Sequence, residues 1–147
     1  MNLEVSFVPH GHLTQVIPLI LPYLPKSEDW SDGRSGVDDI VGFLYSRQMH
    51  LFIVYDTETN EVHGYTIGQV KQYPQKKMLV MQYASGKPGV MAAVETKMHD
   101  FVEKFAKLND CCGIRFVGRR GWMKTMIRHG YNADTIMYEK IFNGETS

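Results

Sequence analysis

The segment YASGKPGVMAAVETKMHDFVEKFAK, from Tyr83 to Lys107, joins a glycine-bearing loop to a long amphipathic helix. The apolar run KKMLVMQ just before it predicts a strand. After the loop, apolar residues recur at helical spacing and form one stripe: Val90, Val94, Met98, Phe101, Val102 and Phe105. A strand, a glycine loop and a helix N-terminus in this order can bind phosphate, because the first amides of a helix are unpaired and carry partial positive charge. The segment therefore predicts either a phosphate site or a simple strand-to-helix turn.

Strands and helices alternate on both sides of this segment. Upstream, the pattern predicts a strand at 3–10, helices at 12–24 and 36–48, and strands at 50–58, 61–73 and 76–86. Downstream, it predicts a strand at 112–118, a short helix at 121–130 and a last strand at 131–142. No repeat or linker interrupts the 147 residues, which favours one domain over residues 1–147. The expected order, β-α-α-β-β-β-α-β-α-β, is that of an α/β domain with a mixed sheet.

The charge balance argues against a general nucleic-acid-binding protein. The formal net charge is zero, whereas binding to phosphate backbones needs a positive excess or a concentrated basic patch. Basic residues cluster only in the stretch GRRGWMKTMIRHG, which contributes Arg119, Arg120, Lys124 and Arg128. We interpret this cluster as a solvated helix end, with a nucleic-acid contact as a lesser alternative.

The two cysteines, Cys111 and Cys112, are neighbours in the sequence, and neighbouring cysteines rarely form a disulfide with each other. This favours a reducing compartment such as the cytoplasm. Additional ligands at metal-binding spacing are missing, so no metal site is expected. We also expect no signal peptide and no membrane span, because the N-terminus and the apolar runs lack the required pattern.

The element order in a chain of this length resembles the GNAT family of acyl-CoA N-acyltransferases, from Leu3 to Phe142. NEVHGYTIGQV is similar to the family's hairpin strand, and MLVMQYASGKPG lies where the family places its central strand and pyrophosphate loop. MKTMIRHGYNADTIMYEKIF is similar to the family's ending, a short helix closed by glycine and an aromatic residue and then a last strand. The resemblance implies acetyl-CoA as the co-substrate and a small-molecule or protein amine as the acceptor.

By this resemblance, the backbone of the central strand would align the pantetheine arm and the following loop would hold the pyrophosphate. The implied cofactor-binding residues are Met81, Gln82, Tyr83, Ser85, Gly86, Lys87, Gly89, Val90 and Met91. The loop departs from the family pattern, because Pro88 or Met91 occupies a position that usually holds a small residue. Pro88 removes one amide donor, although proline is well tolerated in a first helical turn.

The resemblance gives less guidance on proton transfer. The position at which many family members carry a tyrosine to protonate the departing thiolate is Met126 here, and methionine has no proton to donate. Tyr131 and His63 are weak candidates for a catalytic role. His99 and Glu95 lie on the long helix, where a surface or structural role is the simpler interpretation.

The loop PKSEDWSDGRSG occupies the place where the family commonly shapes its acceptor site. Its candidate substrate-binding residues are Glu28, Asp29, Trp30 and Asp32, since carboxylates attract a cationic amine and an exposed tryptophan can anchor a partner. Two functions remain open at this point. One is an acetyl-CoA-dependent N-acetyltransferase, and the other is a non-catalytic binding or structural protein on the same fold, for example a phage virion component, with a homo-oligomer or an assembly partner in either case.

Overall fold

The structure is a computed structural model that describes residues 2–24, 36–116 and 123–133, and the single positions 138, 140 and 142. Its strands are β1 (Leu3–Val8), β2 (His50–Asp56), β3 (Val62–Gln72), β4 (Lys77–Gly86) and β5 (Gly113–Phe116). Its α-helices are α1 (Leu13–Ile20), α3 (Val37–Tyr45), α4 (Val90–Ala93), α5 (Glu95–Leu108) and α6 (Met123–Arg128). The short 3₁₀ turns η1 (His10–His12) and η2 (Leu21–Tyr23) flank α1.

The described strands form one five-stranded sheet in which the spatial order follows the chain order. Neighbouring strands from β1 to β4 are antiparallel, whereas β5 runs parallel to β4 after the crossover through α4 and α5. This arrangement confirms the α/β fold class with a mixed sheet. The expected final strand at 131–142 falls mostly on residues outside the described set.

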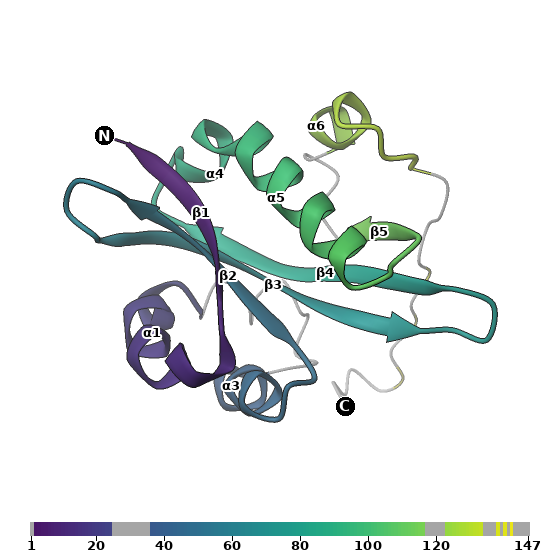
Figure 1. Cartoon of the computed structure of the whole chain (residues 1–147), viewed down its shortest axis with the longest axis horizontal. Coiled ribbons are helices and arrows are strands. Elements are labelled where there is room, and N and C mark those ends of the chain that lie inside the picture. The colour runs from purple at the N-terminus through teal and green to yellow at the C-terminus, as the bar shows by residue number, and fades with distance from the viewer. Residues whose placement is uncertain are drawn as a thin grey trace.

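Helices cover both faces of the sheet, as Figure 1 shows. On one face, the apolar stripe of α4 and α5 packs on side chains of β1, β2 and β4, which include the buried Phe52 and Met81. On the other face, α1 and α3 pack on a second core that includes Tyr65 and Ile67 of β3. The sheet therefore separates two cores, and the residues that carry chemistry have to be assigned to one face or the other.

The helix that the sequence predicts at 88–108 is divided in two. Val94 lies between α4 and α5 with φ −107° and ψ 13°, outside the helical region. Glu95 then begins α5, where a carboxylate interacts favourably with the positive end of the helix. The division makes α4 a single turn that connects the glycine loop to the long helix.

Candidate functional site

The site lies beside the second half of β4, on the α5 side of the sheet. In the described part of the chain, the parallel pairing of β4 with β5 starts at Met78 with Gly113 and ends at Met81 with Phe116. The rest of β4 stays paired with β3 on its other side, up to Gly86 with Gly64. One of these last residues of β4, Ala84, lines the pocket described below.

A β-bulge in β4 determines which of its side chains face α5 and which face the core of α1 and α3. Ile67 of β3 pairs with Tyr83 and the next residue, Gly68, pairs with Met81, so Gln82 is the extra residue. Met81 belongs to the core under α5, whereas Tyr83 packs against the core of α1 and α3. Side chains normally alternate between the faces of a strand, so Tyr83, two positions after Met81, would share its face if β4 were regular here. With the bulge, Ala84 lies on the α5 side, where it contributes a small wall to a pocket.

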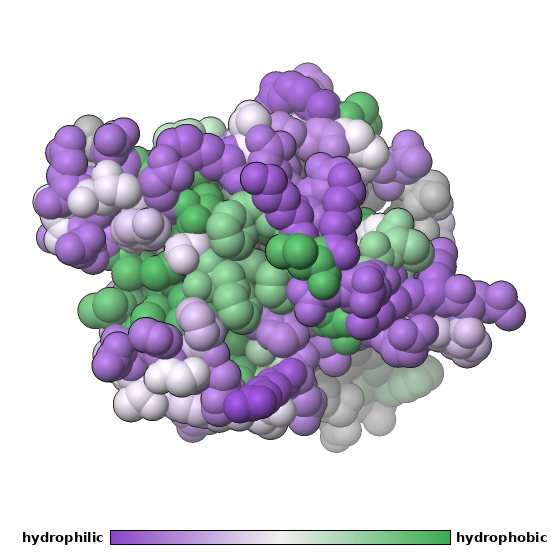
Figure 2. Space-filling view, in the orientation of Figure 1, coloured by the Kyte–Doolittle hydropathy of each residue, from purple (hydrophilic) through white to green (hydrophobic). Residues whose placement is uncertain are grey.

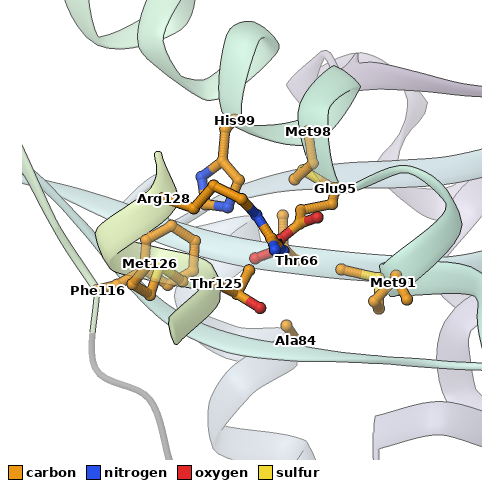
Figure 3. A pocket seen from close by; sticks show the side chains of 11 residues that line it. Thr66, Ala84, Met91, Glu95, Met98, His99, Phe116, Thr125, Met126 and Arg128 are labelled. Atoms are coloured by element: carbon orange, nitrogen blue, oxygen red, sulfur yellow. The ribbon is translucent and has the colours of Figure 1, made fainter. Parts of the chain in front are cut away.

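This pocket has a volume of about 270 Å³ and lies between the sheet, α4, α5 and α6. Its walls are mostly apolar, with a few polar and charged side chains from β3, α5 and α6. The lining residues are Thr66, Ala84, Met91, Ala92, Glu95, Met98, His99, Phe116, Thr125, Met126 and Arg128. Figure 3 shows Met91 on one side, Met126 and Thr125 of α6 on another, and His99 pointing in from α5. An apolar cavity with a few convergent polar groups is the usual form of a small-molecule site.

The loop from Lys87 to Gly89 leads into α4, whose Met91 and Ala92 line this pocket, and it retains free amides. The Lys87 N–H donates to the His63 carbonyl at 2.9 Å, and the Val90 N–H donates to the Lys87 carbonyl at 3.1 Å. The amides of Gly89, Met91 and Ala92 make no backbone hydrogen bond within the described residues. Pro88 therefore removes one donor from the turn, and three others remain unpaired at the start of α4.

Gly86 and Gly89 have different structural roles in this loop. A Cβ on Gly86 would lie 2.7 Å from the His63 carbonyl oxygen and 2.9 Å from the Gly64 Cα, so glycine there allows β3 and β4 to approach. Gly89 has φ 78°, a left-handed conformation that glycine adopts without strain, and its missing side chain would point into open space. Of the two, Gly89 is the one that leaves room beside the loop.

Most of the predicted cofactor-binding residues surround the pocket without contributing their side chains to it. Met91 lines the pocket directly. Met81, Ser85 and Val90 are buried, the Gln82 side chain bonds to Gln69, and the Tyr83 carbonyl accepts a hydrogen bond from Thr66 at 2.9 Å. Lys87 lies 3.8 Å from the Glu61 carboxylate, so its charge is partly balanced. Cofactor binding at these positions stays a prediction.

A cluster of charged and imidazole groups joins α5 to α6 at the pocket wall. Arg128 Nη2 donates to Glu95 Oε1 at 2.6 Å, and this bond lowers the pKa of the Glu95 carboxyl. His129 Nε2 lies 3.5 Å from the same oxygen without making a hydrogen bond to it. The His129 ring stacks on the ring of His99, with centroids 4.2 Å apart. Figure 3 shows Glu95 and Arg128 meeting between the two helices beside His99.

The weak catalytic candidates lie elsewhere. His63 is buried, and its Nε2 lies 3.3 Å from the carboxylate of Glu61, a residue that does not line the pocket. The Tyr131 ring packs on His99 and Phe116 behind the pocket wall, and burial raises the pKa of its hydroxyl to about 12. A catalytic role for either residue stays a prediction. Met126, which the resemblance places at the proton-donor position, does line the pocket.

Several sequence predictions fall outside the part of the chain that the structure describes. These include the acceptor-site candidates Glu28, Asp29, Trp30 and Asp32 and the basic residues Arg119 and Arg120. Among the described residues, no group of three or more metal-binding side chains gathers, and no helix is long and apolar enough to cross a membrane. Cys111 and Cys112 are free thiols, and burial raises the pKa of Cys111.

The sequence interpretation treated His99 and Glu95 as surface or structural residues and omitted His129 and Arg128 from the site. One signal was present, because residues four apart share a helix face and Glu95 therefore presents its side chain beside that of His99. The sequence alone did not indicate that this face meets the end of α6. Packing between two distant helices brings the four residues together.

Neither the protein-family models nor the curated protein sequences give a match to this chain. Solved structures do match its fold over nearly the whole length. Glucosamine-6-phosphate N-acetyltransferase from Arabidopsis thaliana has a TM-score of 0.67 at 6% identity, covering 97% of this chain and 100% of that chain. Aminoglycoside antibiotic 6′-N-acetyltransferase from Acinetobacter baumannii has a TM-score of 0.64 at 12% identity, covering 95% of this chain and 98% of that chain.

A third similar structure is an acetyltransferase from Clostridium acetobutylicum solved with acetyl-CoA. Its TM-score is 0.64 at 12% identity, and the match covers 95% of both chains. A GNAT family acetyltransferase from Staphylococcus aureus is similar to the same extent, with a TM-score of 0.63 at 12% identity, covering 96% of this chain and 99% of that chain. At these identities the comparison establishes the fold, which is that of the GNAT acetyltransferases.

Proposed function

We propose that this GNAT-fold chain is an N-acetyltransferase that moves the acetyl group of acetyl-CoA to an amine. The observation that carries the proposal is the apolar pocket between β4, α4, α5 and α6. The same fold in the acetyltransferase from Clostridium acetobutylicum accommodates acetyl-CoA, which supports the choice of co-substrate. A fold alone does not define an activity, so the pocket and its loop have to be tested directly.

The proposal assigns different parts of acetyl-CoA to chemically different parts of the site. The methionine, alanine and phenylalanine side chains of the pocket suit the largely apolar pantetheine arm and the acetyl group. The amides of Gly89, Met91 and Ala92 are available to the pyrophosphate, and each charge-assisted hydrogen bond of this kind contributes about 1.5–3 kcal/mol. The proposal places the amides of the arm along the backbone of β4, next to the pocket wall at Ala84.

Positioning would supply most of the rate enhancement. Holding the thioester and an amine together converts a bimolecular reaction into an effectively unimolecular one, which can be worth about 7–11 kcal/mol of the barrier. Met126 lines the pocket but has no proton to donate. Proton transfer therefore has to involve another group in the pocket or a water molecule.

The loop can be tested with two nearly isosteric variants, Gly89→Asp and Gly89→Asn. Aspartate and asparagine both tolerate the left-handed conformation at this position, and their side chains would enter open space. The two variants differ mainly in one negative charge beside the proposed pyrophosphate site. We expect Gly89→Asp to weaken acetyl-CoA binding at least tenfold relative to Gly89→Asn, about 1.4 kcal/mol, as measured by calorimetry.

Equal affinities for Gly89→Asp and Gly89→Asn would remove the loop from the site, even if acetyl-CoA binds elsewhere. Circular dichroism of both variants checks that the fold is intact. If the unmodified chain binds no acetyl-CoA at millimolar concentration, the proposed function is wrong. The non-catalytic alternative would then be preferred, although a pocket filled by its own side chains would have fitted that alternative better than the cavity observed.

The acceptor is proposed only as a primary amine. Two of the similar structures act, by name, on glucosamine 6-phosphate and on an aminoglycoside. Both compounds belong in a first panel of acceptors for this chain, together with a polyamine and a lysine-containing peptide. Release of the CoA thiol in the presence of one class and not the others would identify the acceptor chemistry.

A further inference from the structure

The two stacked imidazoles at the pocket wall contain buried nitrogens that lack hydrogen-bond partners. His99 and His129 stack at 4.2 Å with their planes 23° apart. Within the described residues, His99 Nδ1 and His129 Nε2 are shielded from solvent and accept or donate no hydrogen bond. A buried polar atom without a partner costs about 1–3 kcal/mol, so such an atom in a folded protein calls for an explanation.

Charged and titratable groups surround His99 on several elements. Glu95 and Asp100 lie on α5 itself, Arg128 at the end of α6 is engaged with Glu95, and His129 and Tyr131 follow α6. Phe116 of β5 packs on the His99 ring with centroids 5.7 Å apart. Burial is the largest influence on His99 and lowers its pKa below 6.5; His129 adds to this effect, and Glu95 and Asp100 oppose it. His99 is therefore mainly a neutral imidazole at neutral pH.

His99 also lines the pocket, which it shares with Met126 and Ala84. Figure 3 shows its ring projecting from α5 into the space between α6 and the sheet. His99 is the one imidazole among the described residues that line this pocket. The pocket thus contains a neutral base at the wall opposite β4, where the proposed thioester would be held.

We propose that His99 is the proton-transfer residue of this site, taking a proton from the attacking amine and returning it to the departing sulfur. The proposal rests on the proposed acetyltransferase function and deepens it. His129 is a positioning residue. Its ring stacks on that of His99, and its Nε2 lies 3.5 Å from Glu95 Oε1, the oxygen that accepts the hydrogen bond from Arg128.

The proposed step conserves atoms and electrons without any further reactant. The amine nitrogen attacks the thioester carbonyl carbon, forming the C–N bond, and its surplus proton passes to the neutral His99 imidazole. The tetrahedral intermediate then collapses, the C–S bond breaks, and the resulting imidazolium protonates the sulfur. Nitrogen and sulfur are bonded to the same carbon in this intermediate, so one imidazole can serve both. A thiol has an ordinary pKa of about 8.5, which makes the transfer from imidazolium to thiolate favourable.

The test is the pH dependence of CoA release by the full chain with acetyl-CoA and methoxyamine. Methoxyamine is a small, weakly basic amine that stays unprotonated across the range used, so an acid limb reports on the protein. We expect the rate to fall as pH drops through the lowered pKa of His99. In His99→Gln, we expect the rate above this limb to fall about a hundredfold, the size typical of general acid–base catalysis.

Two further variants separate proton transfer from a structural role. His129→Gln removes a group that lowers the pKa of His99, so the acid limb should move to higher pH. His12→Gln changes an exposed histidine far from the site in sequence and should leave both rate and limb unchanged. Calorimetry with acetyl-CoA should give the same affinity for His99→Gln as for the unmodified chain.

The results of these measurements distinguish failure of the His99 role from failure of the transferase function. If acetyl-CoA binds and the unmodified chain releases CoA, while His99→Gln keeps its rate or its acid limb, the role of His99 is overturned and the transferase function stands. If the unmodified chain binds acetyl-CoA but gives no rate above that in buffer, both proposals are overturned. Loss of rate in His99→Gln with unchanged affinity for acetyl-CoA, together with the shifted acid limb in His129→Gln, supports His99 as the proton-transfer residue.

Discussion

At the residue scale, two glycines three positions apart illustrate how the same residue type can serve packing or a ligand. Gly86 is required because the backbones of β3 and β4 approach each other where a Cβ would lie. Gly89 is required because the chain turns through a left-handed conformation there. From the sequence, both glycines are predicted to belong to a phosphate-binding loop. Their contacts and backbone conformation in the structure show that they have different roles.

This difference leads to a stability prediction for Gly86→Ala. The added methyl group would lie 2.7 Å from a carbonyl oxygen and 2.9 Å from a Cα, both of which belong to the backbone and cannot move aside easily. We expect a loss of about 1–3 kcal/mol in the free energy of unfolding, as is usual for overpacking, measured by urea denaturation.

Gly42→Ala is the matched control for that measurement. Gly42 lies inside α3, and a Cβ there would meet nothing within 4 Å. Alanine should therefore stabilise this helix by up to about 1 kcal/mol, because glycine is a poor helix former. If Gly86→Ala were as harmless as Gly42→Ala, β3 and β4 would have to be farther apart than the structure places them.

Site residues were harder to predict than glycines, for a physical reason. His63 was a catalytic candidate because it precedes a glycine on a predicted strand. In the structure it lies next to Glu61 and does not line the pocket. His99 received a structural interpretation because a histidine on a helix is usually unremarkable. Its importance depends on the contact with His129, thirty positions later, and a contact of that range is set by packing rather than by local pattern.

At the element scale, the strands and helices follow closely from the sequence, because their apolar periodicities are long and regular. The strand predicted at 76–86 is found at Lys77–Gly86, and the helix predicted at 36–48 is found at Val37–Tyr45. Asp39 Oδ2 accepts the Gly36 N–H at 3.0 Å at the start of that helix, so its local chemistry agrees with the pattern. The interruptions were not predicted, since Gln82 and Val94 are not marked by an adjacent glycine or proline in their own elements, and the glycine at the bulge, Gly68, lies on the partner strand β3.

The bulge can be tested by deleting Gln82. Deletion makes Met81 and Tyr83 neighbours, so simple alternation keeps Met81 and Ala84 on the α5 side and Tyr83 in the core of α1 and α3. We expect the deletion variant to fold and to lose no more than about 2 kcal/mol in the free energy of unfolding, because the side chains of both faces keep their places.

Gln82→Ala is the control for the deletion. Its side chain makes one hydrogen bond, to Gln69 Oε1 at 3.3 Å, so the substitution should cost at most about 1 kcal/mol. Thermal denaturation of both variants gives the comparison. A deletion variant that lost several kcal/mol more than Gln82→Ala would mean that Gln82 is not a simple extra residue and that β3 and β4 pair in another register.

At the scale of the whole molecule, the sheet divides the chain into two separately packed halves. Figure 2, in the orientation of Figure 1, shows an apolar area over β1 and the facing side of α5, surrounded by hydrophilic side chains. Phe7 of β1 and Phe105 of α5 pack on each other with ring centroids 5.1 Å apart. Lys97 of α5 also reaches β1, donating to the Leu3 carbonyl at 2.9 Å and to Glu4 at 2.8 Å. The long helix is thus attached to the edge of the sheet that lies farthest from the proposed site.

The described residues of β5 and α6 are less buried than those of β2 and β3. All four residues of β5 are intermediate or exposed, as are the α6 residues whose burial is described, whereas β2 and β3 each contain several buried side chains. Regions with few buried contacts open more often than the molecule unfolds as a whole. Amide hydrogens of β5 and α6 should therefore exchange with deuterium faster than those of β2 and β3, in experiments on the free chain.

Acetyl-CoA should slow exchange selectively at β5 and α6 if it binds in the pocket that these two elements help to form. Uniform slowing, or protection confined to α1 and α3, would place the ligand elsewhere. Phe116 of β5 and three residues of α6 line the pocket, so a bound ligand would fasten the late part of the chain to the four-stranded antiparallel meander β1–β4 that precedes it.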